Sequence, residues 1–211
     1  IKERLKKIEE ILKIKNPQIK SMVIVDTAPV LERDLAYRAG LGWFGKNSML
    51  IHKKEGSFFI IASLLTSEVF DISSKDLVAD HCGTCHACVE HCPTNAIDPM
   101  TRTLIAQNCI ATFTIETFSP KIPPKGFETT SEIFGCDICQ DVCPWNIKPL
   151  KIEKNISRES KMLSFLHDFF SQTRVEIQRK IEQMSGRQFQ KFFQGTVFSR
   201  PTKKGFLKNF L

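Results

Sequence analysis

Apolar residues recur at helical spacing near the start of the chain. The stripe consists of Ile1, Leu5, Ile8, Ile11 and Leu12. Most neighbours in it are three or four positions apart, so the pattern predicts an amphipathic helix over residues 1–16. Asn16 followed by Pro17 marks the end of this helix, because proline disfavours a helical conformation in the residue before it.

A short apolar run follows the first helix. Residues 21–25, with the sequence SMVIV, have the length and composition of a buried strand. Asp26 stands where this strand ends. Pro29 suits the first turn of a second helix that runs to Arg38, and Gly40 is expected to stop it.

Further elements are expected along the rest of the chain. Residues 48–52 and 57–65 read as two strands joined in a hairpin by the turn KKEG, and residues 103–116 read as a helix. Residues 161–211 hold nine of the seventeen Phe residues, mostly at helical spacing. This last segment therefore predicts a small layer of about three helices around a Phe core.

Composition places the chain among ordinary globular proteins. Of its 211 residues, 42% are hydrophobic and 25% are charged, which is enough for a core and too apolar for a disordered tail. No apolar run is long enough to span a bilayer, and the basic opening IKERLKKIEE is unlike a secretion signal. Because the chain opens without Met, we expect it to be processed or to be part of a longer protein.

Positive charge is concentrated at the two ends. The net charge is +7, and residues 183–211 carry six Lys or Arg residues and no acidic residue. Residues 1–20 carry seven basic and three acidic residues, so the middle of the chain is slightly acidic. This distribution suits a polyanionic partner such as RNA or DNA, and an ordinary solvated surface is the equally weighted alternative.

The eight cysteines lie in two blocks and one isolated position. The first block has the spacing C-x2-C-x2-C-x3-C-P, the second has C-x2-C-x3-C-P, and Cys109 stands alone between them. The first block matches the bacterial ferredoxin run that binds [4Fe–4S] clusters. Structural zinc favours two separated C-x2-C pairs, and cysteines three residues apart pair poorly as disulfides. The pattern therefore favours two [4Fe–4S] clusters over zinc or disulfides.

Spacing also predicts which cysteines share a cluster, because the fourth cysteine of this run ligates the other cluster. The first set of ligands is Cys82, Cys85, Cys88 and Cys143. The second set contains Cys92, Cys136 and Cys139 and requires one more thiolate. An ordinary ferredoxin supplies it at the position that is Ile133 here, so Cys109 is expected to take its place.

Three parts of the chain outside the cysteine blocks are candidates for chemistry or binding. Asp26 can act as a general acid, and its alternative role is to cap the helix that follows. In the loop GLGWFGKNS, residues 40–48, glycines allow a large ligand to approach, although a plain turn before a hairpin is as reasonable. The basic stretch SRPTKKGFLK, residues 199–208, suits contacts with phosphates.

Taken together, these segments resemble the epoxyqueuosine reductase family, and the resemblance covers nearly the whole chain. Five segments carry it: VDTAPVLER (25–33), RAGLGWFGKNSMLI (38–51), CGTCHACVEHCPTNAI (82–97), QNCIATFTIE (107–116) and FGCDICQDVCPWN (134–146). The closing stretch GTVFSRPTKKGFLKN (195–209) is similar to the basic end of the family.

The resemblance implies an enzyme that reduces epoxyqueuosine to queuosine at the wobble position of tRNA. It implies two [4Fe–4S] clusters that pass electrons to a cobalamin cofactor, with Asp26 as the proton donor. The cobalamin contacts that it implies are Lys46, Asn47, Ser48, Leu50, Lys53, Ala111, Cys136 and Asp137. It further implies a cytoplasmic monomer that uses a flavodoxin or ferredoxin system as electron donor and does not bind a membrane.

The expected fold class is α+β. Residues 1–70 are expected to form part of a cobalamin-binding α/β domain, residues 71–147 a two-cluster ferredoxin-like domain, and residues 148–211 a helical basic region. Two departures from the family are visible. The family has a long N-terminal segment ahead of the helix that opens this chain, and it often has Ser at the position of Ala111.

Two other functions remain open at this stage. A two-cluster electron-transfer module would explain the cysteines, but not the segments around Asp26 and residues 40–48. Another corrinoid iron–sulfur reductase, such as a reductive dehalogenase, would share both cofactors but would not need a basic RNA-binding end. Cobalamin binding separates the first alternative from the reductase, and salt-sensitive tRNA binding separates the second.

Overall fold

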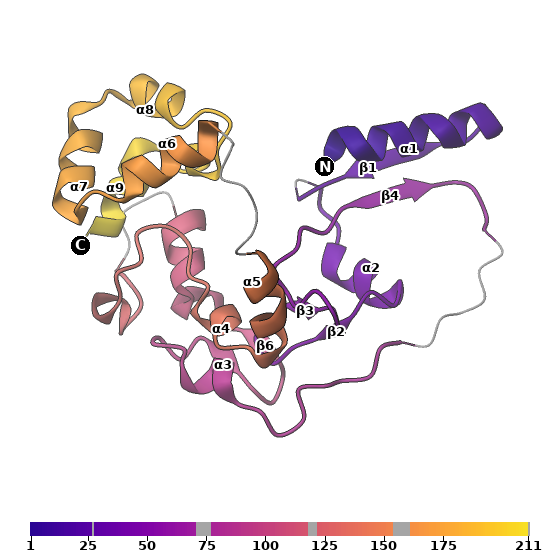
Figure 1. The fold of residues 1–211 in the computed structure, drawn as a ribbon, viewed down its shortest axis with the longest axis horizontal. Coiled ribbons are helices and arrows are strands. Elements are labelled where there is room, and N and C mark those ends of the chain that lie inside the picture. Colours follow the sequence, from indigo (N-terminus) through magenta and orange to yellow (C-terminus); the bar gives the residue numbers. More distant parts are fainter. Residues whose placement is uncertain (27, 71–76, 118–121, 154–160, 211) are drawn as a thin grey trace.

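The computed structural model describes residues 1–26, 28–70, 77–117, 122–153 and 161–210. Its parts are arranged around a central cysteine-rich segment (Figure 1). The N-terminal helix and its two-stranded sheet lie at the upper right of the view, and the C-terminal helices lie at the upper left. The predicted boundary between residues 70 and 71 adjoins residues 71–76, which lie outside the described ranges.

The elements are short and mixed, in keeping with the expected α+β class. The helices are α1 (Lys2–Lys15), α2 (Glu32–Arg38), α3 (Ala87–Glu90), α4 (Ile138–Asp141), α5 (Ile147–Glu153), α6 (Lys161–Phe170), α7 (Arg174–Gln183), α8 (Gly186–Phe192) and α9 (Lys203–Leu207). The strands are β1 (Ser21–Ile24), β2 (Trp43–Phe44), β3 (Leu50–Ile51), β4 (Ser63–Thr66), β5 (Ile97–Asp98) and β6 (Thr103–Leu104). Each described sheet has two antiparallel strands, paired β1–β4, β2–β3 and β5–β6.

The first helix and strand form where the sequence predicts them, but β1 is not the buried strand expected, because Met22 is 59% exposed and only Ile24 is buried. Helix α1 packs against β1 and β4, and the Ser21 hydroxyl donates a hydrogen bond of 2.6 Å to the carboxylate of Glu9. Ile8 and Ile11 of its apolar stripe nevertheless remain about half exposed. The sheet beneath α1 is thus too small to cover the whole stripe.

The predicted hairpin between residues 48–52 and 57–65 is wrong. Strand β3 pairs with β2, β4 pairs with β1, and the KKEG turn is closed only by a bridge between His52 and Gly56. After this turn the chain contacts Asn146, the residue just before α5. The Ser57 amide donates to the side-chain oxygen of Asn146 at 2.7 Å. A Cβ atom on Gly56 would lie 2.0 Å from that same oxygen.

Close pairing of β2 with β3 explains the glycines of residues 40–48. A Cβ atom on Gly42 would lie 2.2 Å from the backbone oxygen of Ile51. The Gly45 amide donates to the Met49 carbonyl at 2.8 Å, and this bond closes the loop between the two strands. The segment therefore contains the turn of a hairpin between β2 and β3, whereas the sequence suggested a turn ahead of a hairpin further along the chain.

The predicted helix over residues 103–116 is divided in three. Residues 103–104 form β6, Ala106–Asn108 form a 3-10 turn, and Thr112–Glu116 form a π-helix. Cys109 has extended backbone between the last two pieces. The spacing of apolar residues did not reveal this break. It occurs at Cys109, whose side chain faces other cysteines, and this requirement is not visible in the apolar pattern.

The C-terminal Phe residues form a core, as predicted, although four helices rather than three surround it. Phe169, Phe189, Phe193 and Phe206 are buried together with Ile177 and Ile181 of α7. The layer packs on the cysteine-rich segment through Phe134. Asn209 is fully buried there, and its amide donates to the carbonyls of Thr114 and Ile133 at 3.0 and 2.9 Å. Among the described helices, none is long and apolar enough to cross a membrane.

Candidate iron–sulfur and substrate site

The eight cysteines surround two separate cavities in the predicted combinations. Cavity one is lined by Cys82, Cys85, Cys88 and Cys143. The other is lined by Cys92, Cys109, Cys136 and Cys139, called cavity two. All eight are free thiols, so the disulfide alternative does not describe this fold. Each cavity presents the four sulfur ligands that a cubane cluster requires.

Local structure places the two sets of cysteines side by side. Helices α3 and α4 pack against each other, and they carry Cys88 of cavity one and Cys139 of cavity two. Pro144 starts the 3-10 turn that follows Cys143, as expected for the proline after a fourth cysteine, whereas the chain after Cys92 turns without forming a helix. Among the described residues, no three His, Cys, Asp or Glu side chains lie close enough together to hold a single metal ion; the four thiolates of a cubane cluster bind four different iron atoms and lie farther apart.

The thiols in cavity two lie in an apolar environment. Burial raises the pKa of Cys136 to about 11 and that of Cys139 to about 12. Burial also raises the pKa of Cys88 and of Cys143 in cavity one. These thiols are therefore protonated at neutral pH unless a positively charged metal centre displaces the protons, so binding a cluster releases protons.

Lys46 and Asn47, which the sequence suggested as cobalamin contacts, turn toward the cysteine loops. Lys46 is only 8% exposed, and its Nζ donates to the carbonyls of Gly83 and Cys85 at 2.9 Å each. The side-chain amide of Asn47 donates to the carbonyl of Cys139 at 3.2 Å. Both side chains line cavity one.

A wide groove of about 830 Å³ lies beside cavity two. Leu104 lines both the groove and cavity two, so the two spaces are neighbours. One wall of the groove is apolar, with Phe44, Phe59, Ile60 and Ile61. Its polar side chains include Asp26, Ser48 and Arg102. Apolar walls with a few polar groups are typical of sites that bind large organic ligands.

The backbone around this groove is strained. Asp26, Ser48 and Arg102 have φ values of 62°, 63° and 56°, in the left-handed region that disfavours side chains with a Cβ atom. Ser48 and Arg102 are also linked directly, because the Ser48 hydroxyl donates to the Arg102 carbonyl at 2.7 Å. Strain of this kind collects at functional sites, where surrounding contacts hold it in place.

Arg102 connects the groove to cavity one. Its Nη2 lies 2.6 Å from a carboxylate oxygen of Asp80, and its Nη1 donates to the Phe44 carbonyl at 2.9 Å. The Arg102 hydrogen bond lowers the pKa of Asp80 to about 2. The other oxygen of Asp80 accepts the amide hydrogen of Cys82 at 2.8 Å. No sequence motif pointed to Arg102, since its role depends on partners far away in the chain.

Asp26 does not cap helix α2. That helix begins at Glu32, and Leu31 occupies its N-cap position. Instead, the Asp26 amide donates to the Glu32 carboxylate at 3.1 and 3.2 Å. The Asp26 side chain is 70% exposed at the edge of the groove. Its geometry therefore leaves the carboxyl group accessible to a molecule in the groove.

Arg200, near the C-terminal end of the chain, contacts Asp26. The guanidinium of Arg200 lies 3.4 Å from Asp26 and 2.9 Å from Glu116. Arg200 thus joins the loop after β1 to the π-helix that follows Cys109. Pro201, the next residue, is fully buried and holds the backbone of this stretch in place.

The remaining predicted cobalamin contacts are dispersed. Leu50 is buried in β3, Lys53 is exposed in the KKEG turn, and Ala111 directly precedes the π-helix. Cys136 lines cavity two, and Asp137 accepts a hydrogen bond of 2.6 Å from the side chain of Gln140. Of the eight predicted contacts, only Ser48 lines the groove.

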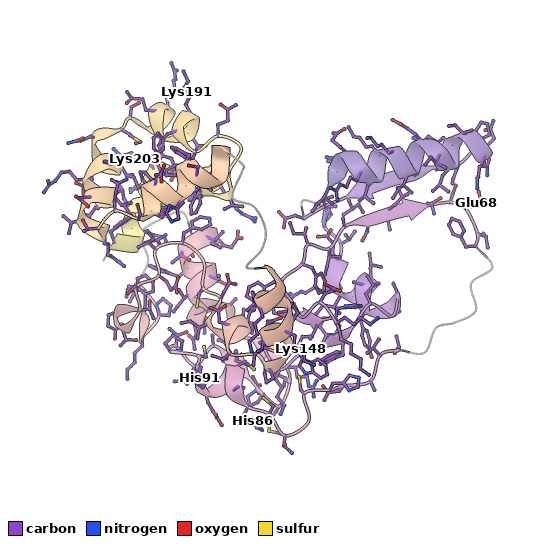
Figure 2. The ribbon with its side chains drawn as sticks, viewed as in Figure 1. Glu68, His86, His91, Lys148, Lys191 and Lys203 are labelled. Atoms are coloured by element: carbon purple, nitrogen blue, oxygen red, sulfur yellow. The ribbon has the colours of Figure 1, made fainter. Side chains whose placement is uncertain are left out.

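The basic C-terminal stretch is only partly available to a phosphate. Lys203 donates to the carbonyls of Glu182 and Met184 at the end of α7, at 2.8 and 2.5 Å, so it caps that helix. Figure 2 shows Lys203 within the C-terminal layer, whereas Lys191 projects outward from α8. Lys191 and Arg187 line a shallow groove of about 420 Å³ on this outer surface.

Comparison with protein families places an iron–sulfur module in the middle of the chain. Residues 81–146 match the family described as a 4Fe-4S double cluster binding domain. This range contains all eight cysteines. The match agrees with the two cavities and leaves the assignment of individual ligands as a prediction.

Curated relatives extend the likeness to almost the whole chain. The epoxyqueuosine reductase of Cyclobacterium marinum is 38% identical over 99% of this chain and 63% of its own length. That of Leadbetterella byssophila is 45% identical over 69% of this chain and 47% of its own length. The chain therefore spans about half to two thirds of the length of these relatives.

Solved structures show the same fold. An epoxyqueuosine reductase bound to an epoxyqueuosine-modified tRNA-Tyr stem loop is 28% identical, with a TM-score of 0.75 over 99% of this chain and 52% of its own. The Bacillus subtilis epoxyqueuosine reductase, with its catalytic aspartate loop swung out of the active site, is 27% identical. Its TM-score is 0.76 over 99% of this chain and 51% of its own.

Proposed function

We propose that this chain, which belongs to the epoxyqueuosine reductase family, is the cluster-bearing part of an enzyme that reduces epoxyqueuosine to queuosine in tRNA. The observation that carries the proposal is the position of the groove: it holds Asp26 at its edge and shares Leu104 with a cavity lined by four cysteines. A carboxyl group and a redox centre thus border the same space.

The reaction defines what the site must supply. Reducing the epoxide to an alkene breaks both carbon–oxygen bonds and releases the oxygen as water, which consumes two electrons and two protons. The clusters deliver electrons one at a time, and cobalamin provides the reducing centre at the substrate when it is bound. The chain's own side chains must hold the cofactors, orient the substrate and deliver a proton.

The groove suits one face of a large, flat cofactor such as cobalamin. Phe59, Ile60 and Ile61 offer an apolar wall, and Ile60 is 69% exposed, which leaves it open to a ligand. Ser48 adds a hydroxyl group at the same site. We therefore assign cobalamin binding to this wall and Ser48, rather than to the side chains of Lys46 and Asn47, which are engaged with the cysteine loops.

Asp26 is the proposed proton donor for the oxygen that leaves the epoxide. Its carboxyl group lies at the edge of the groove, and its left-handed backbone is held by the bond from its amide to Glu32. Among the titratable side chains that line the groove, Arg102 pairs with Asp80 and Asp34 pairs with Arg38, with N–O distances of 2.6 and 2.7 Å. Glu32, which also lines the groove, accepts the backbone amide of Asp26, and within the described residues the Asp26 carboxylate has the longer contact of 3.4 Å with Arg200.

An RNA substrate fits the distribution of charge. Unpaired bases of an anticodon loop can be turned outward into a pocket, and basic side chains on the surrounding surface can follow the phosphates. Arg187 and Lys191 on α8 are accessible for this role. We further propose that the enzyme is monomeric and cytoplasmic. We also propose that it receives electrons from a flavodoxin or ferredoxin system, because exposed Cys85 brings cavity one close to the surface.

Nucleoside mass analysis of tRNA tests this function. A host that lacks its own epoxyqueuosine reductase would express the gene with cobalamin supplied. Loss of epoxyqueuosine and the appearance of queuosine, one oxygen lighter, is the expected result. Unchanged epoxyqueuosine, from a protein that holds iron and cobalamin, would instead indicate a corrinoid reductase with another substrate. A protein that holds iron but never cobalamin would indicate an electron-transfer module.

A further inference from the structure

Lys46 is a buried cation beside the thiols of cavity one. It is 8% exposed, and it lines this cavity together with Cys82, Cys85, Cys88 and Cys143. Its Nζ donates to two carbonyls of the loop that carries these cysteines, those of Gly83 and Cys85. The ammonium group is thus held in one place by the loop that would wrap the cluster.

Within the described part of the chain, no carboxylate pairs with this ammonium group. The ion pairs formed there by Asp and Glu involve other lysines, arginines and a histidine. Carbonyl dipoles and the edge of His86, whose Nε2 lies 3.4 Å away, are the polar contacts of Lys46. Burying a cation without an anion is costly, so an anionic group is expected nearby when the protein is complete.

We infer that Lys46 is the counter-charge of the cluster in cavity one and raises its reduction potential. A [4Fe–4S] cluster held by four thiolates is an anion, and it gains one further negative charge when it accepts an electron. A fixed ammonium group stabilises the more negative, reduced form, and burial strengthens this effect because water screens it less. Lys46 is therefore a positioning and tuning residue, and it does not touch the substrate.

The effect is specific to one of the two clusters. Lys46 lines cavity one and is absent from the lining of cavity two. Cavity one also has an exposed cysteine, Cys85, whereas the four cysteines of cavity two are partly buried. A higher potential in cavity one favours acceptance of an electron from an external donor at the surface.

The inference rests on the iron–sulfur part of the proposed function and not on the RNA reaction. It is tested by redox titration of the protein with both clusters loaded, followed by electron paramagnetic resonance, without any substrate. A protein that holds both clusters but leaves epoxyqueuosine unchanged would overturn the proposed reaction, and this titration could still be carried out.

Three variants separate charge from packing. Lys46→Gln removes the charge and keeps a hydrogen-bond donor, Lys46→Arg keeps the charge, and Lys53→Gln removes an exposed lysine from the turn that follows β3. In Lys46→Gln, we expect the equilibrium constant for reducing one cluster to fall about tenfold, equivalent to a potential about 59 mV lower for a one-electron couple. Lys46→Arg and Lys53→Gln are expected to titrate close to wild type.

The other possible results of these titrations also decide whether Lys46 is the counter-charge of the cluster. Unchanged potentials in Lys46→Gln, or equal shifts in Lys46→Gln and Lys46→Arg, would overturn the inference, because charge would then not be the cause. If Lys46→Gln loses half of its iron while Lys46→Arg retains it, the ammonium is the counter-charge that the cluster needs. Loss of iron from both variants would assign Lys46 to packing alone.

Discussion

At the scale of single residues, Cys109 is the predicted cluster ligand that lies apart from both cysteine blocks. It lines cavity two with Cys92, Cys136 and Cys139. Cys109→Ala is expected to lower the iron content by about half, because one cluster loses a ligand while the other keeps all four. Iron analysis and visible absorbance of anaerobically purified protein measure this, with Gln107→Ala as the exposed neighbouring control. Full iron content in Cys109→Ala would contradict the ligand sets.

Asp26 is the second prediction at this scale. Asp26→Asn keeps the shape of the side chain but cannot donate the same proton, so turnover is expected to fall by about a hundredfold or more. Iron and cobalamin content should remain as in wild type. Asp34→Asn is the matched control, because Asp34 also lines the groove but pairs with Arg38. Equal turnover in the two variants would remove Asp26 from the mechanism.

At the scale of elements, Asn146 joins the turn after β3 to helix α4. It is fully buried, accepts the Ser57 amide at 2.7 Å and donates to the Ser57 hydroxyl and the Gln140 carbonyl at 3.0 and 2.7 Å. Asn146→Ala leaves buried donors and acceptors without partners, so it is expected to destabilise the protein by about 2–4 kcal/mol. Urea titration measures this change.

A suitable comparison for that variant lies two residues further along the chain. Lys148 is exposed on α5, and Lys148→Ala is expected to change stability by less than about 0.5 kcal/mol. Similar urea midpoints for Asn146→Ala and wild type would show that the buried network contributes little. In that event another contact must divert the chain away from the predicted hairpin.

At the scale of the whole molecule, Lys208 ties the C-terminal layer to the cysteine-rich segment. Its Nζ donates to the carbonyl of Phe113, lies 3.9 Å from the centre of the Phe113 ring and contacts the side-chain oxygen of Asn209. Burial lowers the pKa of Lys208 to about 8 from the ordinary value of 10.5. The strength of this attachment therefore depends on pH.

The sign of that dependence follows from the two pKa values. Below about pH 8 both the folded and the unfolded chain hold the proton, and the folded state carries the full cost of burying the charge. Between about pH 8 and 10.5 the unfolded state binds more protons, so the contribution of Lys208 to stability rises with pH. The stability of wild type relative to Lys208→Met should therefore increase from neutral to alkaline pH.

Urea titrations of both proteins near pH 7 and near pH 10 measure this change. Taking the difference between wild type and Lys208→Met removes the contribution of other groups that titrate in the same range, such as the buried thiols. A constant difference across the range would contradict the burial of the Lys208 charge.

The sequence by itself determined the features that depend on local spacing and composition. The two blocks of closely spaced cysteines, the Phe core, helix α1 and strand β1 follow from residues at short, regular intervals, which local geometry translates directly into structure. Tertiary structure alone decided the pairing of β1 with β4, the placement of Lys46 and Asn47 against the cysteine loops, and the contact between Asp26 and Arg200. Those contacts join residues far apart in the chain, and their energies depend on which surfaces meet, which no local pattern records.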